Sequence, residues 1–137
     1  VDALDGTGDF IAGRNDFTVN IALVRDHAPV AGVVYAPALG RMWSGAAGGA
    51  EVADVSADGE ISGRKIIRTR ATPKTRLVCL KQWDIAAGDA VLRAAGGATL
   101  TLDGVPLRYG VEGSDFGCAR FVGWGRDPGA PRQAPSP

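Results

Sequence analysis

Residues 17–36 read FTVNIALVRDHAPVAGVVYA, and this stretch decides the fold class. Within 17–24, strongly apolar residues alternate with smaller or polar ones, which is the two-residue period of a β-strand with one apolar face. Residues 30–36 are rich in valine and predict a second strand. The linker 25–29 is short, so the pattern predicts a hairpin, and Pro37 then ends the pairing.

Further short strands are expected on the C-terminal side of this hairpin. Residues 42–44 and 51–55 predict a third and a fourth strand. The segment 61–78 is basic and β-branched without a clear period, and its strand cores are expected at 66–67 and 77–78. Together these patterns predict mainly antiparallel strands.

One helix stands out, at residues 84–95, which read DIAAGDAVLRAA. Asp84 is a favourable N-cap, and the glycine pair 96–97 is a favourable helix end. One face combines apolar and small residues that permit close packing. This face consists of Ile85, Gly88, Leu92 and Ala95.

The C-terminal part of the chain mixes short strands with a proline-rich tail. Residues 98–102 and 107–109 predict a second hairpin, and residues 116–124 form a last apolar stretch. Residues 127–137 carry four prolines and no core-forming residue, so they are predicted to be disordered.

Composition excludes several classes of function. The 137 residues correspond to one domain or part of one. The net charge is zero, with 15 basic and 15 acidic residues, which argues against a nonspecific nucleic-acid binder or a polybasic membrane-surface protein. No apolar run approaches the roughly 18 residues of a membrane span. Cys79 and Cys118 form no disulfide framework and predict reduced thiols in a cytoplasmic protein.

The first residues, VDALDGTG, carry the strongest chemical signal. Asp2 and Asp5 offer hard oxygen ligands suited to Mg²⁺, and the carbonyl of Leu4 lies between them. The Gly-Thr-Gly run at 6–8 frees backbone N–H groups to face an anion. Asp84 is a third carboxylate at the predicted helix start. Spacing alone is a weak signal, because Asp-x-x-Asp-Gly is also common turn chemistry.

The amino-acid sequences of several segments resemble motifs of the inositol monophosphatase superfamily. DALDGT is similar to its usual Asp-Pro-(Leu/Ile)-Asp-Gly-Thr motif, and WDIAAG is similar to its Trp-Asp-x-Ala-Ala-Gly motif. FTVNIALV, VAGVVYAP, GAAGGA and LDGVPLRY match the flanking segments in the same order. Residues 14–43 most resemble the CysQ-type bisphosphate nucleotidase branch. The resemblance extends over residues 1–124.

The resemblance implies an α/β layered sandwich of the sugar-phosphatase type, with mostly antiparallel strands and one clear helix. It implies an Mg²⁺-dependent phosphomonoesterase in which metal-bound water attacks phosphorus. Adenosine 3',5'-bisphosphate or a related small phosphate ester would be the substrate, with an inositol phosphate as the alternative.

Residue roles follow from the same resemblance. Asp2, Asp5 and Asp84, with the Leu4 carbonyl, would hold metal, and Asp5 would also take part in catalysis. The backbone N–H groups of Gly6 and Thr7 would bind the phosphate. The Thr7 hydroxyl would orient the attacking water.

Departures from the family pattern leave other interpretations open. The chain starts at Val1, so we expect the natural start, a metal-binding glutamate and the family's N-terminal helices to lie upstream. Only four residues separate Val78 from Trp83, where family members have several dozen. We therefore expect one incomplete domain over 1–126, in blocks 1–78 and 82–126, with exposed sheet faces that include Ile21 and Leu23. A catalytically incompetent remnant is one alternative, and a homodimer that completes the site is another.

Three other features of the sequence are interpreted as structural rather than functional. His27, the single histidine, is expected to be an exposed loop residue. The basic residues of 64–76 are expected to form a solvated face. The three tryptophans are expected to lie in the core or at its rim rather than to act as base-stacking platforms, since no basic stripe surrounds them.

Overall fold

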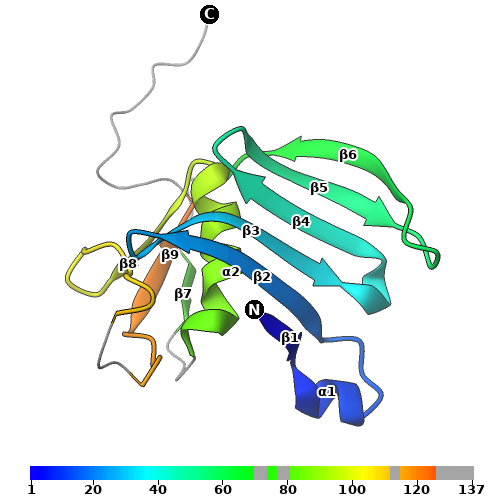
Figure 1. Cartoon of the computed structure of the whole chain (residues 1–137), viewed down its shortest axis with the longest axis horizontal. Helices are drawn as coiled ribbons and strands as arrows, with labels where there is room; N and C mark the ends of the chain where they lie inside the picture. Colours follow the sequence, from blue (N-terminus) through cyan, green and yellow to red (C-terminus); the bar gives the residue numbers. More distant parts are fainter. Residues whose placement is uncertain (70–73, 77–80, 112–114, 126–137) are drawn as a thin grey trace, which may run out of the picture.

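The computed structural model describes residues 1–69, 74–76, 81–111 and 115–125. Two antiparallel sheets enclose one main helix (Figure 1). The larger sheet holds six strands in sequence order: β1 (Asp2–Asp5), β2 (Thr18–Arg25), β3 (Ala28–Ala36), β4 (Arg41–Ala46), β5 (Gly49–Val55) and β6 (Ile61–Ile67). Mainly antiparallel strands with one main helix are therefore confirmed.

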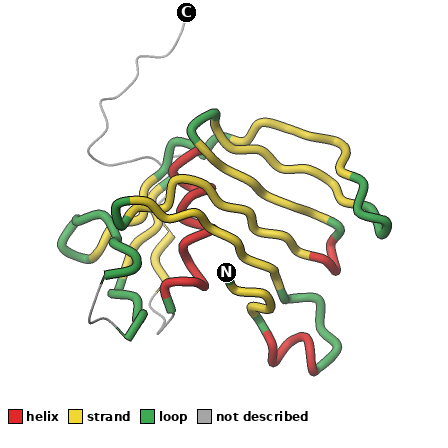
Figure 2. Tube along the Cα trace, in the orientation of Figure 1, coloured by secondary structure: helices red, strands yellow, loops and turns green. Residues whose placement is uncertain are grey.

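The smaller sheet holds three strands in the order β7 (Lys74–Arg76), β9 (Phe121–Trp124) and β8 (Ala98–Thr101). The main helix, α2 (Gln82–Ala94), contacts β2, β3 and β4 on one side and β8 on the other. Figure 2 shows this helix between the two sheets. Two short helices complete the described elements: α1 (Thr7–Ile11) and the 3-10 helix η1 (Pro37–Leu39).

The hairpin predicted over 17–36 is present as β2 and β3. Asp26 and His27 both adopt positive φ, at 50° and 63°, which is the backbone of a tight two-residue turn. Because the turn is this short, β3 begins at Ala28 rather than at residue 30. Pro29 lies opposite Val24 at a shift in register, where the missing N–H of proline is tolerated.

The predicted N-cap of the main helix is wrong. Lys81 is the cap residue, and Asp84 is the third residue of α2. The Lys81 backbone N–H donates a 2.8 Å hydrogen bond to the Asp84 carboxylate. A carboxylate at this position satisfies an N–H group that the helix leaves open. Asp84 therefore still fixes where the helix starts, from two residues further in.

The predicted packing face of α2 is wrong in part, because Gly88 is exposed. Close packing depends instead on glycines in the sheet. A Cβ on Gly32 would meet the carbonyl oxygen of Ala87 at 2.5 Å, and a Cβ on Gly45 would meet the Cα of Val91 at 2.7 Å. The buried residues of the helix are Gln82, Ile85, Ala86, Ala87, Asp89, Ala90 and Val91.

The second predicted hairpin is present in part, and β8 has a second partner that was not predicted. The segment that follows β8 returns beside it through an antiparallel bridge between Leu100 and Pro106, with two further backbone hydrogen bonds, and β8 also pairs with β9. Leu107 and Tyr109 then enter the core beside Ala86. The strand core predicted at 77–78 and the tail predicted at 127–137 lie outside the described residues.

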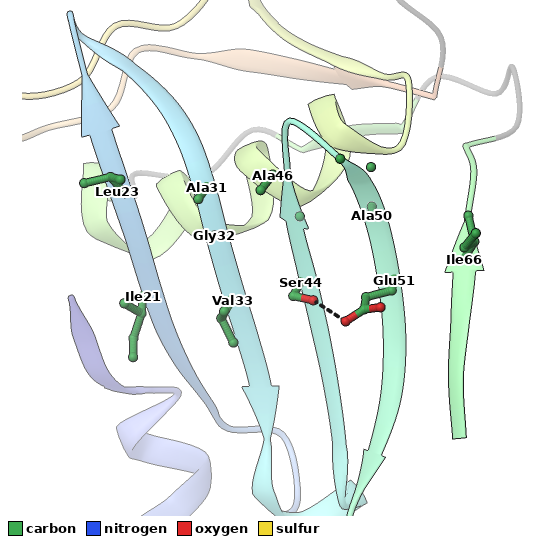
Figure 3. Close-up of a pocket in the computed structure, with 13 residues that line it drawn as sticks. Ile21, Leu23, Ala31, Gly32, Val33, Ser44, Ala46, Ala50, Glu51 and Ile66 are labelled. Carbon is green, nitrogen blue, oxygen red and sulfur yellow. Dashed lines mark hydrogen bonds between the residues drawn. The ribbon is translucent and has the colours of Figure 1, made fainter. Parts of the chain in front are cut away.

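One face of the six-stranded sheet is open. Ile21 and Leu23 are 48% and 56% exposed, and Ile66 is 82% exposed. Figure 3 shows these side chains around a groove of about 500 Å³, with a hydrogen bond from Ser44 to Glu51 near its middle. The helix α2 covers only the opposite face, so the expected exposure of this sheet face is present. Among the described residues, no helix is long and apolar enough to cross a membrane.

Candidate metal centre

Three carboxylates that are far apart in the sequence come together at one end of the larger sheet. Asp2 and Asp5 lie on β1, and Asp84 lies on the first turn of α2. One oxygen atom from each lies within 4.8 Å of the others, and all three residues are half-buried. The strand β1 and the helix α2 are in contact, which is what brings the two sequence segments together.

A shift in strand register explains why Asp2 and Asp5 point the same way. Residues three apart on a regular strand point to opposite faces of the sheet. Here Asp2 pairs with Asn20 and Asp5 pairs with Thr18, so β1 uses one more residue than β2. An extra residue of this kind re-aims side chains. Because of this extra residue, the side chains of Asp2 and Asp5 point to the same side of the sheet although they are three residues apart.

Asp5 is held by a buried amide. The Asn20 Nδ2 group donates a 3.2 Å hydrogen bond to Asp5 Oδ2, and the Thr18 hydroxyl donates to Asn20 Oδ1 at 3.3 Å. Asn20 is only 3% exposed. We missed Asn20 in the sequence, although its signal was there. It is the one amide in the otherwise apolar and hydroxyl-bearing run FTVNIALV.

The surroundings of Asp2 in the cluster disfavour its charged form and raise its pKa. Partial burial raises its pKa above the ordinary value, and hydrogen bonding with Asp84 and the charges of Asp5 and Asp84 raise the pKa further. A 3.2 Å hydrogen bond from the Leu4 N–H to Asp2 Oδ1 acts in the opposite direction. A bound cation would relieve this repulsion, and oxygen-only donor sets suit Mg²⁺ or Ca²⁺.

Gly6 and Thr7 connect the cluster to α1. Gly6 has φ +83°, and a Cβ there would meet the carbonyl oxygen of Asp16 at 2.5 Å, so this position requires glycine. The Thr7 hydroxyl donates a 3.1 Å hydrogen bond to the Leu4 carbonyl. The segment of Leu4, Gly6 and Thr7 thus forms one tight turn next to the carboxylates.

The helix that supplies Asp84 is fixed by a second, buried carboxylate. Asp89 accepts hydrogen bonds from the Tyr109 hydroxyl at 2.9 Å and from Arg93 Nε at 2.8 Å. The backbone N–H of Gly110 donates to Gln82 Oε1 at 2.7 Å. Contacts of this kind join α2 to the segment after β8. Spacing in the sequence gave no signal for the Tyr109–Asp89 pair.

Other residues considered from the sequence lie elsewhere. His27 is half-buried in the β2–β3 turn, with Nδ1 2.9 Å from the Tyr109 carbonyl oxygen. The prediction that His27 is exposed is therefore wrong, although it does lie in the turn. Arg64 is exposed, as expected for a solvated face, and pairs with Glu51. Cys79 and Arg70 lie outside the described residues.

Several known proteins are similar to this chain. Residues 1–80 match the model of the inositol monophosphatase family. The 3'(2'),5'-bisphosphate nucleotidase CysQ of Escherichia coli K12 is 33% identical over 80% of this chain and 61% of its own length. An uncharacterized Rhizobium leguminosarum protein is 60% identical over 48 residues, which is 32% of this chain and 50% of that protein. This chain therefore spans about half to three-fifths of the length of these relatives.

The solved structures show the same fold. CysQ from Bacteroides thetaiotaomicron, described as a bacterial member of the inositol monophosphatase family, superposes with a TM-score of 0.71 at 24% identity. The match covers 88% of this chain and 67% of that chain. The layered α/β class expected from the resemblance is thereby confirmed. With the family model matching more than half of the sequence and carboxylates gathered from both of its motifs, this chain belongs to the inositol monophosphatase family.

Proposed function

We propose that this chain carries the metal and phosphate site of an Mg²⁺-dependent phosphomonoesterase. The observation that supports this most is the convergence of Asp2, Asp5 and Asp84 within 4.8 Å, although 78 residues separate the second from the third. Clusters of three carboxylates without a nearby cation repel one another. Such an arrangement is favourable when divalent metal is bound.

Each residue of the site has a role in this proposal. Asp2, Asp5 and Asp84 would bind Mg²⁺ together with the Leu4 carbonyl. When bound, Mg²⁺ supplies polarisation of the phosphoryl oxygens and activation of water. The backbone N–H groups of Gly6 and Thr7 would bind the phosphate, since the first N–H groups of a helix have no partner within it.

Two further side chains would control geometry at the reacting atoms. The Thr7 hydroxyl already lies 3.1 Å from the Leu4 carbonyl oxygen and would orient the attacking water. Asp5 would take part in catalysis next to the reacting atoms, and Asn20 keeps its carboxylate in position. Both roles depend on the tight turn that Gly6 makes.

The substrate we propose is adenosine 3',5'-bisphosphate or a related small phosphate ester. The support is the bisphosphate nucleotidase activity named for the CysQ relatives, which are 33% identical over 80% of this chain. An inositol phosphate is the second candidate, because the family as a whole takes its name from that substrate.

The direct test is phosphate release from adenosine 3',5'-bisphosphate with and without Mg²⁺. We expect release that requires the metal, and a decrease of at least ~100-fold in the Asp84→Asn variant, in line with the loss of essential metal support. Asp103→Asn is the matched control, because Asp103 is an exposed carboxylate in a turn away from the cluster. Equal rates for the wild type and Asp84→Asn would refute the assignment. No release from a protein that melts cooperatively would favour the catalytically incompetent remnant.

A further inference from the structure

Two exposed aromatic rings lie at the start of α2, where Asp84 of the carboxylate cluster also lies. Trp83 immediately precedes Asp84 on α2, and the Phe116 ring lies next to it, with centroids 5.7 Å apart and planes tilted by 44°. Trp83 is 41% exposed and Phe116 is 49% exposed. Rings of this size usually bury most of their surface, so two that stay exposed together present an apolar, planar surface to solvent. We call Trp83 and Phe116 the aromatic pair.

Hydrogen bonds and one ion pair fix the position of the aromatic pair. The Gln82 backbone N–H donates to the Phe116 carbonyl at 2.8 Å, which ties the loop to the start of α2. Lys81 Nζ donates to the backbone carbonyl of Asp115 at 2.9 Å and to its carboxylate at 3.0 Å. The same ammonium group lies 5.9 Å from the Trp83 ring centroid. The backbone that carries the Phe116 ring is therefore fixed next to the start of α2 before any ligand arrives, which lowers the entropic cost of binding.

Phe116 also adopts an unfavourable backbone conformation. Its φ is +49°, in the left-handed region that residues with a Cβ rarely occupy. Conformations of this kind persist where surrounding contacts hold them, and they cluster at ligand sites. Here the hydrogen bonds from Lys81 and Gln82 hold the backbone at Phe116 in this conformation. In this conformation the Phe116 ring lies next to the Trp83 ring.

The aromatic pair is close enough to the carboxylates to contact the same ligand. Trp83 and Asp84 are consecutive, so their Cα atoms are about 3.8 Å apart. Consecutive side chains on a helix point about 100° apart, since a turn holds 3.6 residues. The Trp83 side chain therefore leaves α2 from the residue next to Asp84, on a neighbouring side of the helix. A ligand with its phosphate at the cluster would extend its remaining part past this ring.

We propose that the aromatic pair binds the nucleobase of the substrate, so that the site selects a nucleoside phosphate over a sugar or inositol phosphate. The inference rests on the proposed function, because the carboxylate cluster sets where the phosphate lies. A nucleobase has a planar π-face that stacks on tryptophan and phenylalanine, whereas ribose and inositol have none. Base stacking on a protein ring changes affinity by about 5- to 150-fold per base.

The test compares two ligands that differ only in the base. Adenosine 5'-monophosphate and ribose 5-phosphate are titrated into the full chain with Mg²⁺, and dissociation constants are measured by calorimetry and by tryptophan fluorescence. We expect the wild type to bind the nucleotide about 5- to 150-fold more tightly than ribose 5-phosphate. In Trp83→Leu, and separately in Phe116→Leu, the nucleotide affinity should fall toward that of ribose 5-phosphate. Trp43→Leu, on β4, is the matched control and should keep the preference.

The outcomes separate this inference from the proposed function. Equal affinities for the two ligands in the wild type would overturn base binding, whatever the phosphatase assay shows. Retention of the full preference in both Trp83→Leu and Phe116→Leu would also overturn it. If adenosine without phosphate binds the wild type more tightly than Trp83→Leu while no phosphate is released from any ester, the aromatic pair is supported and the phosphatase proposal fails. If neither ligand binds, both fail. The comparison of ligands in the wild type does not depend on how well the variants fold.

Discussion

The hydroxyl of Tyr109 donates a 2.9 Å hydrogen bond to a carboxylate oxygen of Asp89, and both side chains are buried. Removing the hydroxyl leaves part of a buried carboxylate without its donor, which costs about 1–3 kcal/mol. We therefore expect Tyr109→Phe to lower the free energy of unfolding by this amount in urea denaturation. Tyr35→Phe, on β3, is the control and should change it much less. Equal effects of the two changes would mean that the Tyr109 hydrogen bond contributes nothing specific.

The same pair predicts how stability changes at alkaline pH. Burial raises the pKa of Tyr109 far above its usual value, and the charge of Asp89 and the hydrogen bond to it add to the shift. The folded protein thus retains this proton at a pH where the unfolded chain loses it. Stability from this group is complete below about pH 10, the pKa of an exposed tyrosine, and decreases as pH rises above it.

The alkaline prediction is measured as the free energy of unfolding between pH 9 and 11. We expect the wild type to lose up to about 1.4 kcal/mol per pH unit from Tyr109 above pH 10. Tyr109→Phe should show a shallower slope by that amount, although it starts from a lower stability. Identical slopes in the two proteins would show that Tyr109 ionises at its ordinary pKa in the folded state.

Close approach between α2 and the sheet predicts opposite effects for two glycine changes. Gly32→Ala places a Cβ 2.5 Å from the Ala87 carbonyl oxygen, so it should destabilise the protein by about 1–3 kcal/mol. Gly88→Ala lies within α2, where a Cβ meets nothing within 4 Å, so it should stabilise the protein by up to about 1 kcal/mol. Thermal melts of both variants check the signs, and a neutral Gly32→Ala would contradict the packing described.

The carboxylates of the cluster repel one another when no metal is bound. We therefore expect a variant that removes one of these charges, Asp2→Asn, to be more stable than the wild type when both are free of metal. The pKa of Asp2 is raised in the folded protein, so the group favours folding at acidic pH and opposes it once pH rises through the folded pKa. Asp2→Asn keeps the acceptor for the Leu4 N–H and removes the charge. We expect it to raise the melting temperature in EDTA at pH 7.

The control for this prediction is pH itself. The advantage of Asp2→Asn should shrink as pH falls through the raised pKa of Asp2 in the folded protein, and disappear below the ordinary pKa of 3.8, where the carboxyl is neutral in both the folded and the unfolded chain. A variant that melts below the wild type at pH 7 would show that Asp2 is not repelled by Asp5 and Asp84.

Local sequence patterns were sufficient to predict much of the fold. The alternation in FTVNIALV was sufficient to predict β2, and the glycine pair at 96–97 marked the helix end. The start of the helix was misjudged because Asp84 bonds back to the Lys81 N–H from the third helical position. A carboxylate looks the same in the sequence at either position. The pairing of β8 with β9 was not predicted because β9 lies about 20 residues away, beyond the range of a local pattern.

The candidate site was predictable only in its residue types. Asp2, Asp5 and Asp84 were chosen for their chemistry, and the structure brings them together. The shift in register between β1 and β2, which aims Asp2 and Asp5 to one side, depends on pairing with a distant strand and leaves no local trace. The buried contact between Asn20 and Asp5 depends on the same pairing. Long-range register therefore decides the geometry of this site.

The most direct test of the account is a calorimetric titration of the metal-free chain with Mg²⁺, on the wild type and on Asp84→Asn. The account predicts saturable binding to the wild type and binding at least about tenfold weaker to Asp84→Asn, since a ligand to the metal is lost. Asp103→Asn should bind like the wild type. Absence of binding to the wild type, or equal binding to Asp84→Asn, would contradict the claim that the three carboxylates form one metal centre.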